Sequence, residues 1–194
     1  MDKPLILKNY AKRVSSALMN TDFDALAKAA ELIFNTKKTG ARIYTTGNGG
    51  SHATASHMSN DLVKGCRVMG REGFKSICFG DLPAVLTCLA NDFSYEEVYE
   101  IMLRTHAEHG DILIVFSGSG NSLNIVNAAK LAKEMGVTVI SFGGRDGGKM
   151  KEYSDVQVLA PTDCMEEIED LHLIYEHALI TLLTQMLTGL YKSE

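Results

Sequence analysis

The sequence has 194 residues, 45% of them hydrophobic, with a formal net charge of −5. These values suit one compact globular domain, and the lack of a basic cluster argues against a nucleic-acid partner. The longest apolar runs, such as residues 112–116, are too short to cross a bilayer, and the first residues show no signal-peptide pattern. Since the four cysteines form no C-x-x-C pair, we expect free thiols in a cytoplasmic protein without membrane association.

The predicted elements alternate between helices and strands. Residues 4–38 show helical periodicity in two stretches, separated by Asn20-Thr21-Asp22, which resembles a helix cap. Strands are then expected at 41–46, 75–80, 111–117, 137–143 and 156–160, and helices at 51–64, 83–90, 95–106, 121–135 and 164–191. This order predicts an α/β three-layer sandwich with a central parallel sheet. We expect a single domain over 1–194, with an N-terminal helical extension (1–38) and an α/β core (39–194).

Two predicted strand ends carry glycines and hydroxyl side chains. The first is Gly47-Asn48-Gly49-Gly50-Ser51, and the second is Ser117-Gly118-Ser119-Gly120-Asn121-Ser122. Unpaired backbone N–H groups and the positive dipole end of a helix stabilise an anion at such places. Each loop alone is equally well explained as a tight turn with a serine cap, but two on successive crossovers favour a phosphate site. Neither has the Walker or the dinucleotide pattern, so we expect a small phosphorylated metabolite.

Five sequence blocks resemble the phosphoheptose isomerase family of sugar isomerase (SIS) domains. They are "GNGGSHATASHMSNDL" (47–62), "LANDFSYEEVY" (89–99), "SGSGNS" (117–122), "GGRDGGKM" (143–150) and "IEDLHLIYEH" (168–177). The resemblance implies a SIS, flavodoxin-like fold and a homotetramer with active sites at subunit interfaces. It also implies interconversion of D-sedoheptulose 7-phosphate and D-glycero-D-manno-heptose 7-phosphate, which feeds bacterial surface heptose biosynthesis.

The same resemblance implies roles for individual residues. The implied substrate-binding positions are Asn48, Gly49, Gly50, Ser51, Asp61, Asp92, Ser117, Gly118, Ser119, Ser122 and Glu169. The implied metal ligands are His57, Asp61, Glu169 and His177, and Asp61 and His177 are the implied catalytic pair. Without the resemblance, Asp92 is as well explained as a helix cap, and His177 as a packed histidine.

Three residues depart from the family pattern. The family normally has Glu at the position of Asp61, Gln at that of Glu169 and Thr at that of Gly118. The first change shortens a carboxylate, the second adds a negative charge, and the third removes a hydroxyl near the substrate. They point to an altered substrate, a shifted metal preference or a paralogue without activity.

The chemistry of aldose–ketose isomerisation can be compared with these residues. The reaction moves a proton between adjacent carbons through an ene-diolate, so it needs a base, an acid and positive charge near the oxyanion. His57 and Asp61 stand four apart on a predicted helix, a spacing that suits a metal site, a base oriented by histidine, or a surface pair. With Glu169 and His177 the set suits one Zn²⁺ or another divalent ion per site.

One difficulty concerns the ligand spacing on the last helix. Glu169 and His177 are about 12 Å apart along a straight helix, so Glu169 with His172 is a second candidate metal half-site. The sequence therefore predicts an isomerase, and leaves open an isomerase of another phosphosugar or a non-catalytic SIS-type regulatory protein. Two histidines and two carboxylates favour chemistry, because a pure binding module needs no such set.

Overall fold

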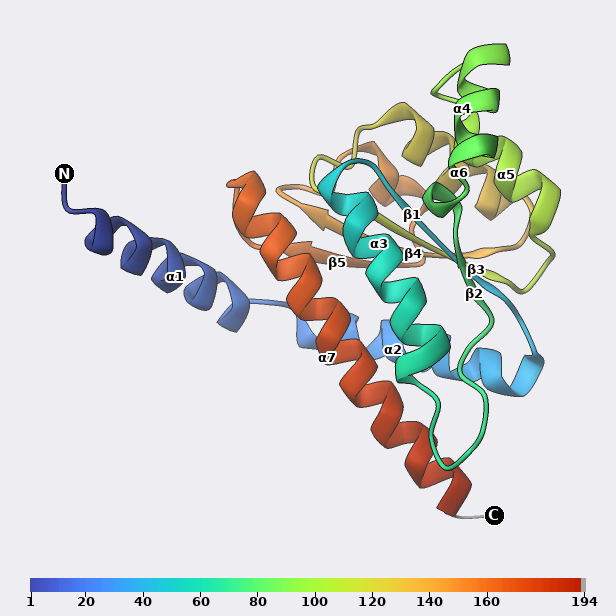
Figure 1. Cartoon of the computed structure of the whole chain (residues 1–194), viewed down its shortest axis with the longest axis horizontal. Coiled ribbons are helices and arrows are strands. Elements are labelled where there is room, and N and C mark those ends of the chain that lie inside the picture. The colour runs from blue at the N-terminus through green and yellow to red at the C-terminus, as the bar shows by residue number, and fades with distance from the viewer. Residues whose placement is uncertain (193–194) are drawn as a thin grey trace.

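A five-stranded parallel sheet lies at the centre of the computed structural model, which describes residues 1–192, with only the backbone described at Tyr191 (Figure 1). Its strands are β1 (Ile43–Gly47), β2 (Ser76–Cys78), β3 (Ile112–Ser117), β4 (Thr138–Gly144) and β5 (Val156–Ala160), in the order β2-β1-β3-β4-β5. The order reverses between β1 and β3, so the chain leaves these two neighbouring strands in opposite directions. Ligands of open α/β sheets bind in the crevice at this point.

Helices cover both faces of the sheet and confirm the predicted three-layer α/β fold. On one face lie α2 (Phe23–Thr39), α3 (Gly50–Asn60) and α7 (Met165–Lys192); on the other lie α5 (Val98–His106) and α6 (Leu123–Glu134), with α4 (Pro83–Asp92) beside them. Ile114 of β3 belongs to the first hydrophobic cluster and Val115 to the second. Because β3 is buried on both faces, its sequence shows no polar alternation.

Helix α1 (Lys3–Met19) stands clear of the sheet and touches the body mainly at α7 (Figure 1). The Tyr10 hydroxyl donates to Asp170 Oδ2 at 2.5 Å, and Arg13 Nε donates to Glu167 Oε1 at 2.6 Å. Asp22 caps α2 as predicted, since its side chain accepts from Ala25 N at 2.9 Å. Among residues 1–192, no helix, including the long α7, combines the length and the apolar character that a membrane-crossing helix requires.

The helix after β1 ends earlier than the sequence predicts. It stops at Asn60 and continues as a π-helical turn, η1 (Asp61–Gly65), in which Cys66 N donates to Asp61 O at 2.9 Å. The Leu62 carbonyl accepts a hydrogen bond from Phe74 N at 2.8 Å. Phe74 lies in the segment that leads back to the sheet, so this carbonyl bonds outside the helix. Two 3₁₀ turns, η2 (Phe79–Asp81) and η3 (Lys149–Tyr153), complete the described chain. Single π-turns occur often at functional sites, and this one begins at a predicted site residue.

Candidate active site

The carboxyl ends of β1 and β3 frame a pocket of about 350 Å³, which we call the anion pocket. It is lined by Asn48, Gly49, Gly50, Ser51, Phe116, Ser117, Gly118, Ser119, Ser122, Met165 and Glu169. The structure thus brings both glycine–serine loops to one place, together with nine of the predicted substrate-binding residues. Phe116 and Met165 are additional lining residues that no polar motif in the sequence marks.

The first loop presents the N-terminus of α3 to the anion pocket. Gly49 precedes the helix with φ +55°, a left-handed conformation that favours glycine, and no side chain caps the helix. Ser51 is almost completely buried in the first turn, and its hydroxyl makes no hydrogen bond within the described chain. The first N–H groups of α3 and this hydroxyl are therefore donors suited to an anion.

Asn48 is held in position by two residues that the sequence analysis missed. Its Nδ2 donates to Asn124 Oδ1 at 2.9 Å, and its Oδ1 accepts from Asn124 Nδ2 at 2.9 Å and from the Tyr95 hydroxyl at 2.8 Å. Asn124 is 2% exposed and lies 76 residues away along the chain. Tyr95 falls within one of the blocks that resemble the family, but nothing in its spacing predicts contact with Asn48.

The second loop is stabilised from within and from the 143–150 block. Ser117 Oγ accepts from Gly120 N at 3.1 Å, and Gly120 O accepts from Met150 N at 3.0 Å. A Cβ on Gly120 would lie 2.0 Å from Gly147 O, so only glycine fits this approach. Ser122 is the N-cap residue of α6, yet its hydroxyl makes no capping bond and stays available to a ligand.

Two side chains of α7 shape the wall of the anion pocket. A Cβ added to Gly118 would lie 2.5 Å from Met165 Sδ, so Met165 occupies the space that a side chain at position 118 would use. A Cβ added to Gly50 would lie 2.5 Å from Glu169 Oε2, so this carboxylate lies against the first turn of α3. The Glu169 charge is therefore placed at the positive end of the helix dipole.

A second group of polar side chains, His57, Asp61, Glu176 and His177, lies further along the same two helices; we call it the histidine–carboxylate cluster. One ligand atom from each lies within 4.8 Å of those from the others. His57 Nε2 is 3.3 Å from His177 Nε2 and 3.5 Å from Asp61 Oδ2. Imidazole nitrogens and carboxylate oxygens are the ligands of Zn²⁺ and related ions, so the donor set fits a divalent cation.

Glu176 is the member of this cluster that the sequence analysis missed. Its side chain is fully buried, and neither carboxylate oxygen has a hydrogen-bond partner among the described residues. Its Oε2 lies 3.3 Å from His177 Nε2, but without hydrogen-bond geometry. Burial, and next the charge of Asp61, raise the pKa of Glu176 to about 8. The one available signal was a glutamate inside an otherwise apolar helical run.

Three predicted residues lie outside the cluster. Glu169, expected as a metal ligand, lines the anion pocket instead of joining the four clustered residues. His172, the second candidate, is buried in the core, where its Nε2 donates to Gly143 O at 3.0 Å. Asp92 is the exposed last residue of α4 and accepts from Asn91 Nδ2 at 2.8 Å. It does not cap the next helix, α5, whose N-cap residue is Glu97.

The anion pocket and the cluster are spaced along two helices that pack side by side, α3 and α7 (Figure 1). Glu169 lies against Gly50 at one end, and His177 lies against His57 further along. Seven residues of α-helix separate Gly50 from His57, which is about 10 Å at 1.5 Å per residue. This distance suits an open-chain sugar phosphate that is held by its phosphate at one end and reacts at the other.

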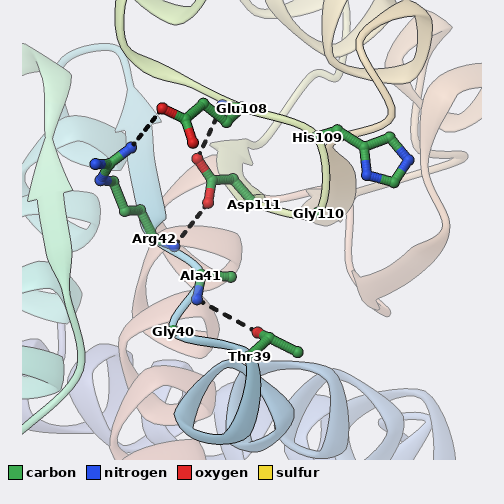
Figure 2. A pocket seen from close by; sticks show the side chains of 8 residues that line it. All are labelled: Thr39, Gly40, Ala41, Arg42, Glu108, His109, Gly110 and Asp111. Atoms are coloured by element: carbon green, nitrogen blue, oxygen red, sulfur yellow. Dashed lines mark hydrogen bonds and ion pairs between the residues drawn. The ribbon is translucent and has the colours of Figure 1, made fainter.

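Polar side chains also gather at two other places in the described chain. His52, Cys78 and Asp81 also lie within 4.8 Å of one another, but they supply three ligand atoms, and burial raises the pKa of the Cys78 thiol. A pocket at the amino ends of β1 and β3 lies at the opposite edge of the sheet (Figure 2). There Asp111 accepts from the backbone of Arg42 and Glu108, so its polar groups satisfy one another.

Comparisons with known proteins show the family of the chain. The SIS domain family matches residues 8–144. A phosphoheptose isomerase from Aliarcobacter butzleri is 33% identical, over 96% of this chain and 99% of its own length, and one from Glaesserella parasuis is 37% identical over 92% and 94%. The solved structure of the phosphoheptose isomerase GmhA from Neisseria gonorrhoeae is 26% identical and superposes with a TM-score of 0.87, covering 95% of this chain and 100% of that one.

The family model and the curated relatives match different lengths of the chain. The SIS match ends with β4 at residue 144, whereas the phosphoheptose isomerase matches extend over nearly the whole chain, including α7. Helix α7 supplies Met165 and Glu169 of the anion pocket and two of the four cluster residues, Glu176 and His177, so these parts of the site lie beyond the shared SIS region. On the extent of these matches, the chain belongs to the phosphoheptose isomerase family of SIS-domain proteins.

Proposed function

We propose that the chain is an aldose–ketose isomerase that interconverts D-sedoheptulose 7-phosphate and D-glycero-D-manno-heptose 7-phosphate in bacterial surface heptose biosynthesis. The observation that carries the proposal is the placing of the anion pocket and the histidine–carboxylate cluster along the paired helices α3 and α7. The names of the family relatives support the same reaction.

In this proposal the anion pocket holds the sugar phosphate. Backbone N–H groups at the start of α3 and the hydroxyls of Ser51 and Ser122 donate to the phosphate oxygens. Ser119 lines the same pocket, and Asn48, fixed by Asn124, faces the sugar beyond the phosphate. We keep Asp92 as a sugar-binding residue only through a neighbouring subunit, since α4 places it on the surface.

Asp61 and His177 carry the proton transfers of the isomerisation. Asp61 removes the proton from C1 of the ketose and returns it to C2, while a proton moves from O1 to O2 with the help of His177. Asp61 lies at the start of the π-turn, and His57 Nε2 lies 3.5 Å from its carboxylate. When no ion is bound, the imidazole can orient the base.

We further propose that the cluster holds one divalent ion, with Zn²⁺ as the first candidate. His57, Asp61 and His177 would be ligands, because their donor atoms converge from both helices. When bound, the ion supplies positive charge near the ene-diolate oxygens as a Lewis acid. The half-exposed histidines keep one side of the cluster open to substrate.

A cytoplasmic homotetramer is the assembly that we propose. All four cysteines are free, which suits a reducing compartment. Helix α1 leaves Leu5, Ile6 and Leu7 at least half exposed, and it stands clear of its own subunit, so a second copy can cover it. The family resemblance adds the number four and active sites between subunits.

A second candidate function is isomerisation of a different phosphosugar. Met165 fills the space beside Gly118, so the pocket wall here differs from one built with the threonine usual in the family. A non-catalytic regulatory protein is the third candidate, but it would leave the convergence of four ionisable groups without a purpose.

The deciding experiment is a turnover assay with metal analysis. Purified protein is assayed with C5–C7 ketose and aldose phosphates, before and after chelation, and its metal content is measured. We expect turnover of sedoheptulose 7-phosphate, its loss on chelation, and its recovery with Zn²⁺. Turnover of another sugar alone would support the second candidate, and no turnover of any sugar would contradict the enzyme assignment.

A further inference from the structure

The burial of Glu176 has no explanation within the polypeptide chain. Its side chain is 0% exposed, and both carboxylate oxygens lack hydrogen-bond donors among residues 1–192. Asp61, whose carboxylate oxygen lies within 4.8 Å of the Glu176 oxygen, is another acidic group and no hydrogen-bond partner. A buried carboxylate without partners destabilises a fold, and an apolar residue of similar size would normally be more stable here.

The position of Glu176 relates it to the candidate metal ligands. Neighbouring residues on a helix normally point in different directions, yet Glu176 Oε2 and His177 Nε2 lie 3.3 Å apart. The same His177 atom is 3.3 Å from His57 Nε2. Glu176 therefore closes the buried side of a cluster whose two histidines are half exposed.

The predicted fourth ligand, Glu169, is placed differently. Its carboxylate lies against Gly50, seven residues before His57 on α3, which is about 10 Å along the helix. Glu176 lies one residue from His177 and supplies an oxygen without any shift of α7. Two histidines and two carboxylates would also balance the charge of a divalent cation.

We propose that Glu176 is the fourth ligand of the divalent ion and that Glu169 belongs to the anion pocket alone. The ion would then be held entirely by His57, Asp61, Glu176 and His177 of one chain. This inference rests on the metal site of the proposed function, but not on the identity of the sugar.

Metal binding by two variants tests the assignment without an activity assay. Zn²⁺ affinity is measured on the full chain by competition with a chromophoric chelator, for the wild type, Glu176→Leu and Glu169→Leu. We expect Glu176→Leu to weaken Zn²⁺ binding roughly tenfold or more, while the matched Glu169→Leu leaves it unchanged. Both changes replace the carboxylate by an apolar side chain that has no atom able to bind the ion.

Thermal unfolding of Glu176→Leu adds a readout that separates a ligand from a buried residue. Without metal, this variant should melt above the wild type, because the unpartnered carboxylate is gone. With Zn²⁺ its melting temperature should rise less than that of the wild type.

Different results overturn different statements. Wild-type affinity in Glu176→Leu, or loss of affinity in Glu169→Leu alone, would overturn this inference and leave the proposed isomerase intact. A wild type that binds no Zn²⁺, Mn²⁺ or Co²⁺ would overturn both the inference and the metal site. A Glu176-dependent Zn²⁺ site in a protein without heptose phosphate turnover would support the inference and contradict the proposed substrate.

Discussion

The Nε2 atoms of His57 and His177 lie 3.3 Å apart, with their rings at 77° to one another, although 120 residues separate them in the chain. Two imidazole nitrogens at this distance can share one proton or direct both lone pairs to a cation, but they repel when both rings are protonated. The pair is therefore sensitive to the loss of either member, and it lies beside the carboxylate of Asp61.

Removal of the proposed acid or base should abolish turnover without unfolding the protein. We expect Asp61→Asn and His177→Ala each to lower kcat about 10²–10⁴-fold, the usual contribution of a positioned acid or base. Both side chains reach solvent, so their loss leaves the hydrophobic clusters intact. The matched control is His109→Ala, an exposed histidine outside the cluster. Near-normal turnover by both site variants would show that these roles are wrong.

Loss of the pocket hydroxyls should weaken phosphate binding more than the chemical step. A hydrogen bond to a charged group contributes about 1.5–3 kcal/mol, so Ser51→Ala and Ser122→Ala should each raise KM roughly 10- to 100-fold. Inorganic phosphate, measured as a competitive inhibitor, should weaken in parallel. Ser15→Ala on α1, an exposed position far from the pocket, serves as the control. An unchanged inhibition constant for phosphate would place the anion elsewhere.

The buried His172 should make the fold sensitive to mild acid. Burial lowers the pKa of His172 to about 4, whereas an unfolded histidine titrates near 6.5. Between these values the unfolded state binds more protons, so the stability contributed at pH 7 is lost as the pH falls from about 6.5 to 4. The loss amounts to about 3 kcal/mol at most. In urea unfolding, His172→Gln should show a smaller decline over this range; an equal decline would assign it to other groups.

Positions 118 and 165 should be coupled in shaping the anion pocket. A threonine at 118 meets the Met165 side chain, whose sulfur would lie 2.5 Å from the new Cβ. Because Met165 is partly exposed and flexible, we expect Gly118→Thr to destabilise the fold by only about 1 kcal/mol but to raise KM. Addition of Met165→Ala should restore both values. Simple additivity in this double-mutant cycle would mean that the two positions do not share the space.

The sequence predicts the framework of the site well, because the relevant signals are local. Strand ends, glycine loops and the cap at Asp22 follow from nearby residues, and the structure confirms the fold that they indicate. Residues distant in sequence meet through tertiary packing, which periodicity does not encode. The pairing of Asn48 with Asn124 is one case.

The assignment of the carboxylates on α7 shows the same limit. Sequence spacing made Glu169 and His177 awkward partners on one helix, but it could not show which carboxylate faces α3 at the level of His57. That depends on how α7 packs against α3, and on this packing Glu176 joins the cluster. The sequence also does not predict the π-turn at Asp61. The turn frees the Leu62 carbonyl, and this carbonyl accepts from Phe74 N, twelve residues further along the chain.

The burial of helix α3 determines when the entropic cost of ordering the active site arises. Its first turn faces the anion pocket and His57 lies near its end, while Ala55 and Met58 of the same helix are fully buried. The helix is thus anchored in the core before any ligand arrives. A sugar phosphate gripped at one end would have its reacting carbons positioned with little further loss of protein entropy. The entropic cost of alignment is then met during folding and not in each turnover.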